Sequence, residues 1–365
     1  MKMKKSATAI STLLAACVLG ALPRAAHAAV HYRPLVKEAR AGNTQAVQQI
    51  MLAARAGHRG PQLYAGVLYY YGWGVPQNYA KANTWYEKAA AQGSARAENG
   101  LGVAYQYGQG VPQNYAKANT WYEKAAAQGY PDAEDNLGSA YYNGQGVPQN
   151  YAKANYWFRK AAAQGVADAE YNLGVAYSSG QGVPQNYAKA NTWYEKAAAQ
   201  GNADAENNLG NAYSSGQGVP LNYAKANTWY EKAAAKGDAD AENNLGAAYQ
   251  YGQGVPQNYA KANTWYEKAA AQGNADAEFN LGVAYQYGQG VPQNYAEADA
   301  WYRKAAAQGV ADAEFNLGNA YYNGQGVPQN TMKAIYWWKK AAAQGGKVGE
   351  IAQHHINLAE TGGAG

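Results

Sequence analysis

The chain has 365 residues, of which 47% are hydrophobic and 15% are charged, and its formal net charge at pH 7 is +5. Its only cysteine is Cys17, which excludes an internal disulfide framework and leaves little scope for thiol chemistry. The small positive charge arises mainly from the first residues of the chain, so it gives no reason to expect a nucleic-acid partner.

Residues 1–28 form a predicted signal peptide. Three lysines within the first five residues precede an apolar core, residues 7–22, that is too short to span a membrane. Ala26-His27-Ala28 fits a signal-peptidase site, so cleavage is expected before Ala29. Removal of this segment takes away four basic residues and no acidic one, which leaves 26 basic and 25 acidic residues.

A second interpretation of the same segment concerns Cys17. Leu14-Ala15-Ala16-Cys17 resembles a bacterial lipobox, which would attach a lipid anchor to Cys17. Residues 18–22 stay apolar, whereas a lipoprotein usually turns polar after the modified cysteine. We therefore predict a freely exported bacterial protein, periplasmic or secreted, with no transmembrane span, and keep the lipid anchor as the alternative.

The rest of the chain is organised by an internal repeat. A tryptophan recurs every 36 residues from Trp85 to Trp337, and a Val-Pro pair keeps the same step. A period of this length is typical of repeat proteins. Within each unit, apolar residues at helical spacing predict two helices, separated by two glycines and a proline that end the first helix. One such pair cannot bury enough apolar surface alone, so the units are expected to stack.

The repeated unit reads Ala-Glu-x-Asn-Leu-Gly-x-Ala-Tyr-x-x-Gly-x-Gly-Val-Pro, followed by Asn-Tyr-x-Lys-Ala-x-x-Trp-Tyr-x-Lys-Ala-Ala-x-Gln-Gly. This pattern resembles the SEL-one-like repeat (SLR), a relative of the tetratricopeptide repeat (TPR). The resemblance implies an all-α, right-handed α-solenoid superhelix of stacked helix-turn-helix repeats that binds other molecules. It does not name the partner.

These patterns divide the chain into four predicted parts. They are a signal peptide at 1–28, an N-terminal helical cap at 29–57, eight 36-residue units at 58–345, and a C-terminal cap helix with a flexible tail at 346–365. In the first cap, Thr44 is expected to cap a helix. In the second, Ile351, Ile356 and Leu358 are expected to cover the last repeat.

Few residues are suited to catalysis. None of the five histidines lies within a well-formed repeat, so a serine or cysteine nucleophile paired with histidine is not expected. His354 and His355 are adjacent on a predicted helix and would point about 100° apart, which disfavours a shared metal. Each Gly-Gln-Gly segment follows a helix and precedes a Val-Pro turn, unlike a phosphate loop. We predict no enzyme activity, no cofactor and no metal site.

The repeats differ from one another mainly at four positions of the first helix. These positions have offsets 0, 4, 7 and 8, which fall within about 100° of arc on one face. The face is rich in Tyr, Phe, Asn, Ser and Gln and almost free of charge, a mixture that binding surfaces use. In TPR superhelices the first helices line the concave surface, so the resemblance implies that this face is a groove. The alternative is neutral drift on a solvated surface.

An asparagine row runs beside the varied face. It aligns with positions where some TPR superhelices hold the main chain of a peptide, and an amide can both donate and accept hydrogen bonds as a backbone does. A structural bond between repeats is an equally good interpretation. The predicted binding residues are Tyr107, Asn136, Tyr142, Tyr171, Asn172, Asn208, Asn211, Asn244, Tyr251, Phe279, Asn280, Tyr287, Phe315, Asn316 and Tyr322.

The predicted function is that of an exported, non-catalytic scaffold for protein–protein interaction, which binds an extended protein or peptide segment in the groove. The alternative is a module that binds a glycan or the cell wall (peptidoglycan), because tyrosines stack on sugar rings and amides bond to hydroxyl groups.

Overall fold

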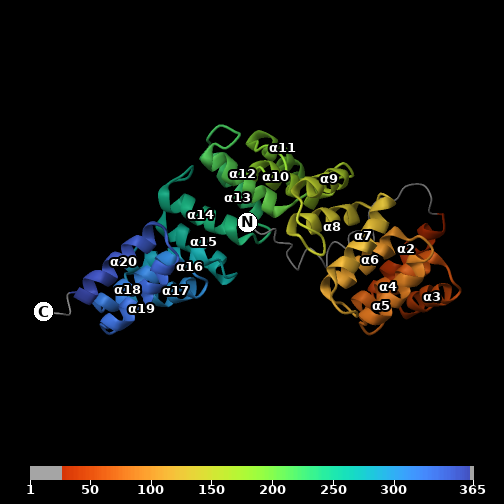
Figure 1. Cartoon of the computed structure of the whole chain (residues 1–365), viewed down its shortest axis with the longest axis horizontal. Coiled ribbons are helices and arrows are strands. Elements are labelled where there is room, and N and C mark those ends of the chain that lie inside the picture. Colours follow the sequence, from red (N-terminus) through yellow and green to blue (C-terminus); the bar gives the residue numbers. More distant parts are fainter. Residues whose placement is uncertain (1–26, 362–365) are drawn as a thin grey trace. The chain divides into compact units, whose positions relative to one another are not determined.

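The computed structural model describes residues 27–361, and every regular element in that range is a helix. Figure 1 shows these helices as a succession of short elements joined by brief turns. The predicted all-α fold of stacked helix pairs is confirmed. Residues 1–26, with most of the predicted signal peptide and Cys17, lie outside the described residues, as do residues 362–365 of the predicted tail.

The helices occur in pairs, with one pair for each repeat. Two helices come first, α2 (His27–Arg40) and α3 (Thr44–Arg55). The first helices of the eight repeats are α4 (Arg59–Tyr71), α6 (Ala95–Tyr107), α8 (Pro131–Asn143), α10 (Ala167–Ser179), α12 (Ala203–Ser215), α14 (Ala239–Tyr251), α16 (Ala275–Tyr287) and α18 (Ala311–Asn323). The second helices are α5 (Tyr79–Ala90), α7 (Tyr115–Ala127), α9 (Tyr151–Ala162), α11 (Tyr187–Ala199), α13 (Tyr223–Ala234), α15 (Tyr259–Ala271), α17 (Tyr295–Ala307) and α19 (Thr331–Ala343). The last helix is α20 (Gly346–Thr361).

The chain divides into two compact units. The described part of the first unit comprises residues 27–173 and 181–184, and that of the second comprises residues 174–180 and 185–361. The boundary falls within α10. Helices α2 to α9 therefore belong to the first unit, and helices α11 to α20 belong to the second.

The repeat that contains α12 and α13 shows how the sequence fixes each helix end. Asn202 caps α12, because its side chain accepts a hydrogen bond from the backbone N–H of Ala205 over 2.9 Å. Gly216 ends the helix in the left-handed region, with φ at 72°. Asn222 then caps α13 through the N–H of Lys225, also over 2.9 Å.

The turn inside each repeat rests on the second helix of the repeat before it. At Gly254, where φ is 72°, a Cβ would lie 2.6 Å from the backbone carbon of Tyr223, so only glycine fits there. Beside this contact, Nδ2 of Asn227 donates to the carbonyl oxygen of Gln253 over 2.8 Å. Asn227 is 4% exposed and this bond satisfies its buried amide. The pair of contacts fixes how neighbouring repeats stack.

The interior of each repeat is built from alanine, leucine and one large ring. Leu245 of α14 is buried together with Tyr230 and several alanines of α13 and α14, and Trp265 of α15 is partly buried at the edge of this cluster. The ammonium of Lys268 lies 4.0 Å from the centroid of the Trp265 ring and covers its outer face. The recurring tryptophan therefore joins the core to the solvated surface.

Both ends differ in detail from the sequence prediction. Asn43, and not Thr44, caps α3: its backbone is extended and its side chain accepts from the N–H groups of Gln45 and Ala46. Thr44 is already the first helical residue.

At the other end, Ile356 of α20 is buried at 2% exposure, whereas Ile351 and Leu358 are 39% and 56% exposed. The expectation that all three cover the last repeat was wrong for these two. They fall on one side of the helix, about 140° and 160° around it from Ile356.

Candidate functional site

Four tyrosines on the first helices are exposed. Tyr251 and Tyr287 are 65% and 64% exposed, while Tyr322 and Tyr107 are 42% and 40% exposed. Each lies in the last turn of its helix: Tyr107, Tyr251 and Tyr287 come just before the glycine that ends the helix, and Tyr322 lies one residue earlier. Three of them belong to consecutive repeats of the second unit, which gives that unit a row of accessible rings on its first helices.

Other predicted members of the site are less accessible. Tyr142 is only 5% exposed, and its hydroxyl donates to the side-chain oxygen of Gln181. Phe279 packs against Tyr302 with ring centroids 5.8 Å apart, and Phe315 packs edge-on against His355 at 5.2 Å. Tyr171 is partly buried. These four aromatic residues contribute less accessible surface than the exposed tyrosines do.

The asparagine row forms bonds between successive first helices. Each bond runs from the Nδ2 of one asparagine to a side-chain oxygen 37 residues earlier in the chain. The bonds are Asn136 to Asn99 (3.0 Å), Asn172 to Asp135 (3.2 Å), Asn244 to Asn207 (2.9 Å) and Asn280 to Asn243 (3.1 Å). At these four positions the asparagine side chain therefore forms the structural bond between repeats that was one of the two interpretations of the row. Asn172 is 5% exposed, so its amide is not open to a ligand.

The row changes where the acceptor is missing. The residue 37 positions before Asn316 is Phe279, which offers no side-chain acceptor, and Asn316 instead acts on Tyr302, where it partly offsets the rise that burial gives the pKa of that hydroxyl. Asn211 is exposed and accepts from both Tyr230 and Asn244, at 2.8 Å and 3.3 Å. Asn208 is partly buried.

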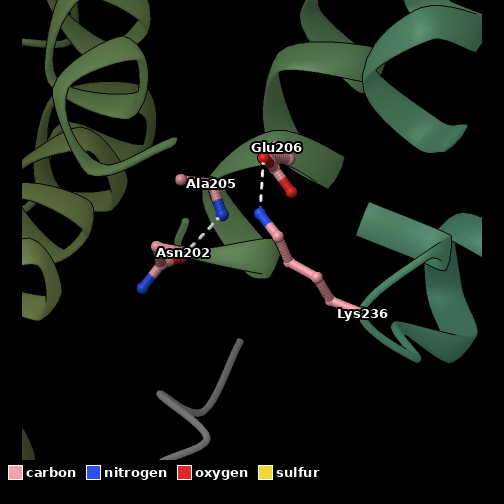
Figure 2. Close-up of polar contacts among 4 residues, drawn as sticks. All are labelled: Asn202, Ala205, Glu206 and Lys236. Atoms are coloured by element: carbon pink, nitrogen blue, oxygen red, sulfur yellow. Dashed lines mark hydrogen bonds and ion pairs between the residues drawn. The ribbon is translucent and has the colours of Figure 1, made fainter. Parts of the chain in front are cut away.

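A row of buried glutamates ties the first helices to the ends of their own repeats, and Gln62 takes this place in the first repeat. Glu242, 6% exposed, accepts a hydrogen bond from the side-chain amide of Gln272 over 2.7 Å. One repeat uses a lysine in place of this glutamine. There, the ammonium of Lys236 lies 2.7 Å from Oε1 of Glu206, as Figure 2 shows. Sequence analysis missed this row, although the Ala-Glu pair at the start of seven of the eight first helices was a visible signal.

The described residues offer little for catalysis. Between residues 27 and 361, no cluster of three or more His, Cys, Asp or Glu could hold a metal ion. The rings of His354 and His355 lie 6.4 Å apart, and burial, with a smaller contribution from His354, lowers the pKa of His355. His355 packs against Phe315 and Trp338, so it is part of the end of the core. In the same stretch, no helix combines the length and apolar character that a bilayer crossing requires.

Comparison with known proteins identifies the repeat. The family model of the Sel1 repeat matches eight consecutive segments: 62–94, 95–130, 131–166, 167–202, 203–238, 239–274, 275–310 and 311–346. The chain belongs to the Sel1 repeat family. This is the SEL-one-like repeat that the sequence pattern resembles, and the predicted family is confirmed.

Two solved structures support the same assignment. A protective antigen of uropathogenic Escherichia coli strains, described as displaying an SLR fold, is 39% identical with a TM-score of 0.71. That match covers 85% of this chain and 66% of the other. A Sel1 repeat protein from Oxalobacter formigenes is 31% identical with a TM-score of 0.65, and the match covers 89% and 93% of the two chains. No match was found among the curated proteins.

Proposed function

We propose that this Sel1 repeat protein is an exported scaffold that binds an extended segment of another protein along the face of its first helices. Sel1 repeat proteins are in general scaffolds for protein interaction. The family supports only this general role. The binding face, the extended form of the partner segment and the export of the protein are the parts that we add.

One observation carries the choice of face. Tyr251 and Tyr287 occupy the same position in successive repeats and are exposed to nearly the same extent, 65% and 64%. Because both rings are largely exposed, packing in the core does not explain why tyrosine recurs at this position. Tyrosine is a frequent binding hot spot because it supplies a large contact area with few rotatable bonds.

The contacts between helices also favour this face. Successive first helices touch each other directly, as α12 and α14 do and as α14 and α16 do. The asparagine bond from Asn244 to Asn207 crosses the first of these contacts. First helices that approach this closely are expected on the inner side of a curved stack, where an extended segment can contact several repeats at once.

The form of the partner follows from the chemistry of the face. Its varied positions hold tyrosine, asparagine, serine and glutamine and almost no charged side chain. A partner segment of extended backbone with apolar or proline residues would stack on the rings and bond to the amides. The predicted absence of catalytic activity is consistent with this role.

A glycan is the second candidate, because the same exposed rings can stack on sugars. The test compares wild-type protein with the triple variant Tyr251→Ala, Tyr287→Ala and Tyr322→Ala, both offered to an extract of the producing cells and to purified peptidoglycan. We expect the wild type to retain a defined protein that the variant loses, with no retention on peptidoglycan. Retention on peptidoglycan that the variant loses would replace the proposal with the glycan candidate.

The control is a second triple variant at tyrosines that pack into the repeats. Tyr249 and Tyr285 are partly buried in the core clusters, and Tyr321 is 7% exposed. Their replacement by alanine should lower the free energy of unfolding by several kcal/mol, whereas the first set should change it by less than about 1 kcal/mol. Equal destabilisation by the two sets would show that the exposed face is assigned wrongly.

A further inference from the structure

Two repeats share a departure on the outer side of their second helices. In the third repeat, α9 carries Tyr156 and Arg159 where α7 carries Thr120 and Glu123. In the eighth repeat, α19 carries Tyr336 and Lys339 at the same two positions. We call the residues Tyr156, Trp157, Arg159 and Lys160 the first outer patch, and Tyr336, Trp337, Lys339 and Lys340 the second outer patch.

The two patches have nearly the same geometry. Tyr156 and Tyr336 are 54% and 56% exposed. Each meets the following tryptophan edge-on at an interplanar angle of 76°, with ring centroids 5.1 Å and 5.3 Å apart. Behind each pair, the ammonium of a lysine lies 4.9 Å or 4.8 Å from the centroid of the tryptophan ring. One patch lies in each unit of the chain.

The substitutions also change the charge. Helix α7 has a net charge of +1, whereas α9 and α19 each have +3. Part of this charge is balanced: Lys160 lies 3.1 Å from Glu134, Lys340 lies 3.8 Å from Glu314, and Lys339 lies 3.4 Å from Glu360.

Core packing explains why α9 carries Phe158 where α7 carries Tyr122, but it does not explain the exposed Tyr156 and Arg159. In α7, the buried Tyr122 donates its hydroxyl to Gln106. In the third repeat, that glutamine is replaced by Tyr142, and the buried ring becomes Phe158, which needs no partner. Tyr156 and Arg159 point away from this exchange, because both are exposed on the solvent side of α9. Core packing therefore does not explain a tyrosine and a basic residue at these two positions of α9.

We propose that the two outer patches bind an acidic polysaccharide. An exposed tyrosine ring can stack on the C–H face of a sugar, and a base one helical turn away can bind the carboxylate of the same or the next sugar. A patch that occurs twice on one chain suits a polymer whose sugars and charges repeat, because two weak sites on one polymer bind more tightly than either alone. This surface lies on the second helices, so the proposal is independent of the first-helix face.

The test uses the full chain and measures the dissociation constant by calorimetry with polygalacturonate and with alginate. The variant Tyr156→Thr with Arg159→Glu, and the variant Tyr336→Thr with Lys339→Glu, restore the residues that five other repeats carry and should fold normally. We expect each to weaken binding by about ten-fold, and the combination of both to weaken it more than either alone. A matched gain is expected from Thr264→Tyr with Glu267→Arg in α15, which builds a third patch.

The comparison ligands are neutral dextran and polyglutamate, which carries the same kind of charge without sugar rings. We expect dextran not to bind and polyglutamate to bind at least several-fold more weakly than either polyuronate. Equal binding of polyglutamate would replace the proposal with an acidic polypeptide partner. If neither polygalacturonate nor alginate binds, or if the combined variant binds them as tightly as the wild type, the proposal is wrong.

Discussion

Tyr266 of α15 packs directly on Gly246 of α14: a Cβ on this glycine would lie 2.4 Å from Cε1 of the ring. The same contact recurs between Gly282 and Tyr302, and a tryptophan takes the place of the tyrosine at Gly318. This contact explains the glycine of the Leu-Gly pair, which seven of the eight repeats carry, because the glycine lets two helices close around a buried ring.

The first prediction tests this contact. Gly246→Ala should lower the free energy of unfolding by about 1–3 kcal/mol, because the added methyl group collides with a ring held on all sides. Gly60→Ala is the matched control, since Gly60 lies in helix α4 with nothing within 4 Å of the added atom. It should be neutral or should stabilise by up to about 1 kcal/mol. Urea denaturation measures both, and equal effects would contradict the packing argument.

The second prediction concerns the ion pair of Lys236 and Glu206 in Figure 2. Glu206 is 3% exposed, so Lys236→Ala should leave a buried carboxylate without its cation and cost about 1–3 kcal/mol. Lys236→Gln restores the amide donor that Gln272 provides to Glu242 in the next repeat, and should cost less than about 1 kcal/mol. Thermal and urea melts of both variants decide the point. If alanine and glutamine prove equivalent, the side-chain bond to Glu206 does not stabilise the repeat.

The third prediction concerns Asp299, which replaces the asparagine that donates to the next turn in other repeats. Asn263, for example, donates to the carbonyl oxygen of Gln289 over 2.7 Å. Asp299 is 4% exposed, and its Oδ2 has no hydrogen-bond partner. Burial raises the pKa of Asp299 to about 6, against a smaller opposing effect of Arg303.

This raised pKa fixes the direction of the pH dependence. Well below pH 4, both the folded and the unfolded chain keep the proton on Asp299, so the residue costs nothing. As the pH rises from about 4 to about 6, the unfolded chain loses this proton before the folded chain does, so stability falls, and at higher pH the loss stays constant. Asp299→Asn should therefore stabilise the protein by about 1–3 kcal/mol at pH 8 and by much less at pH 4. Urea denaturation at the two values provides the check, and a gain that does not depend on pH would contradict it.

The sequence predicts the helix pairs well because their signals are local. The cap at Asn222 and the left-handed Gly216 are set by a few neighbouring residues, and the 36-residue step repeats them. The alternative roles of the asparagine row could not be separated in this way, because the bond from Asn244 to Asn207 joins residues 37 positions apart.

Accessibility was the least predictable property of the site. Tyr142 and Tyr322 occupy equivalent positions, yet one is 5% exposed and the other 42%. The difference depends on what surrounds each ring: Tyr142 bonds to Gln181 and packs edge-on against Tyr151. The raised pKa of Asp299 likewise depends on burial by the folded repeats, which no local pattern reports.

The fourth prediction concerns export. Intact-mass measurement of the protein from its producing cells should give a chain that begins at Ala29, as expected for cleavage after Ala26-His27-Ala28. A mass that corresponds to a lipid on Cys17 would support the anchored form instead. A full-length chain that still begins at Met1 would contradict export by either route.

The fifth prediction tests the first-helix face by contact. A photo-crosslinking amino acid is placed at Tyr287, which is 64% exposed in α16, or at Thr264, which is exposed on α15. Both variants are produced in the native cells and irradiated there. Their adducts are compared by mass spectrometry. We expect a defined protein adduct at position 287 that disappears when Tyr251 and Tyr322 are also replaced by alanine, and none at position 264. Adducts of equal yield at both positions, or none at position 287, would contradict the proposal that the first helices bind a partner protein.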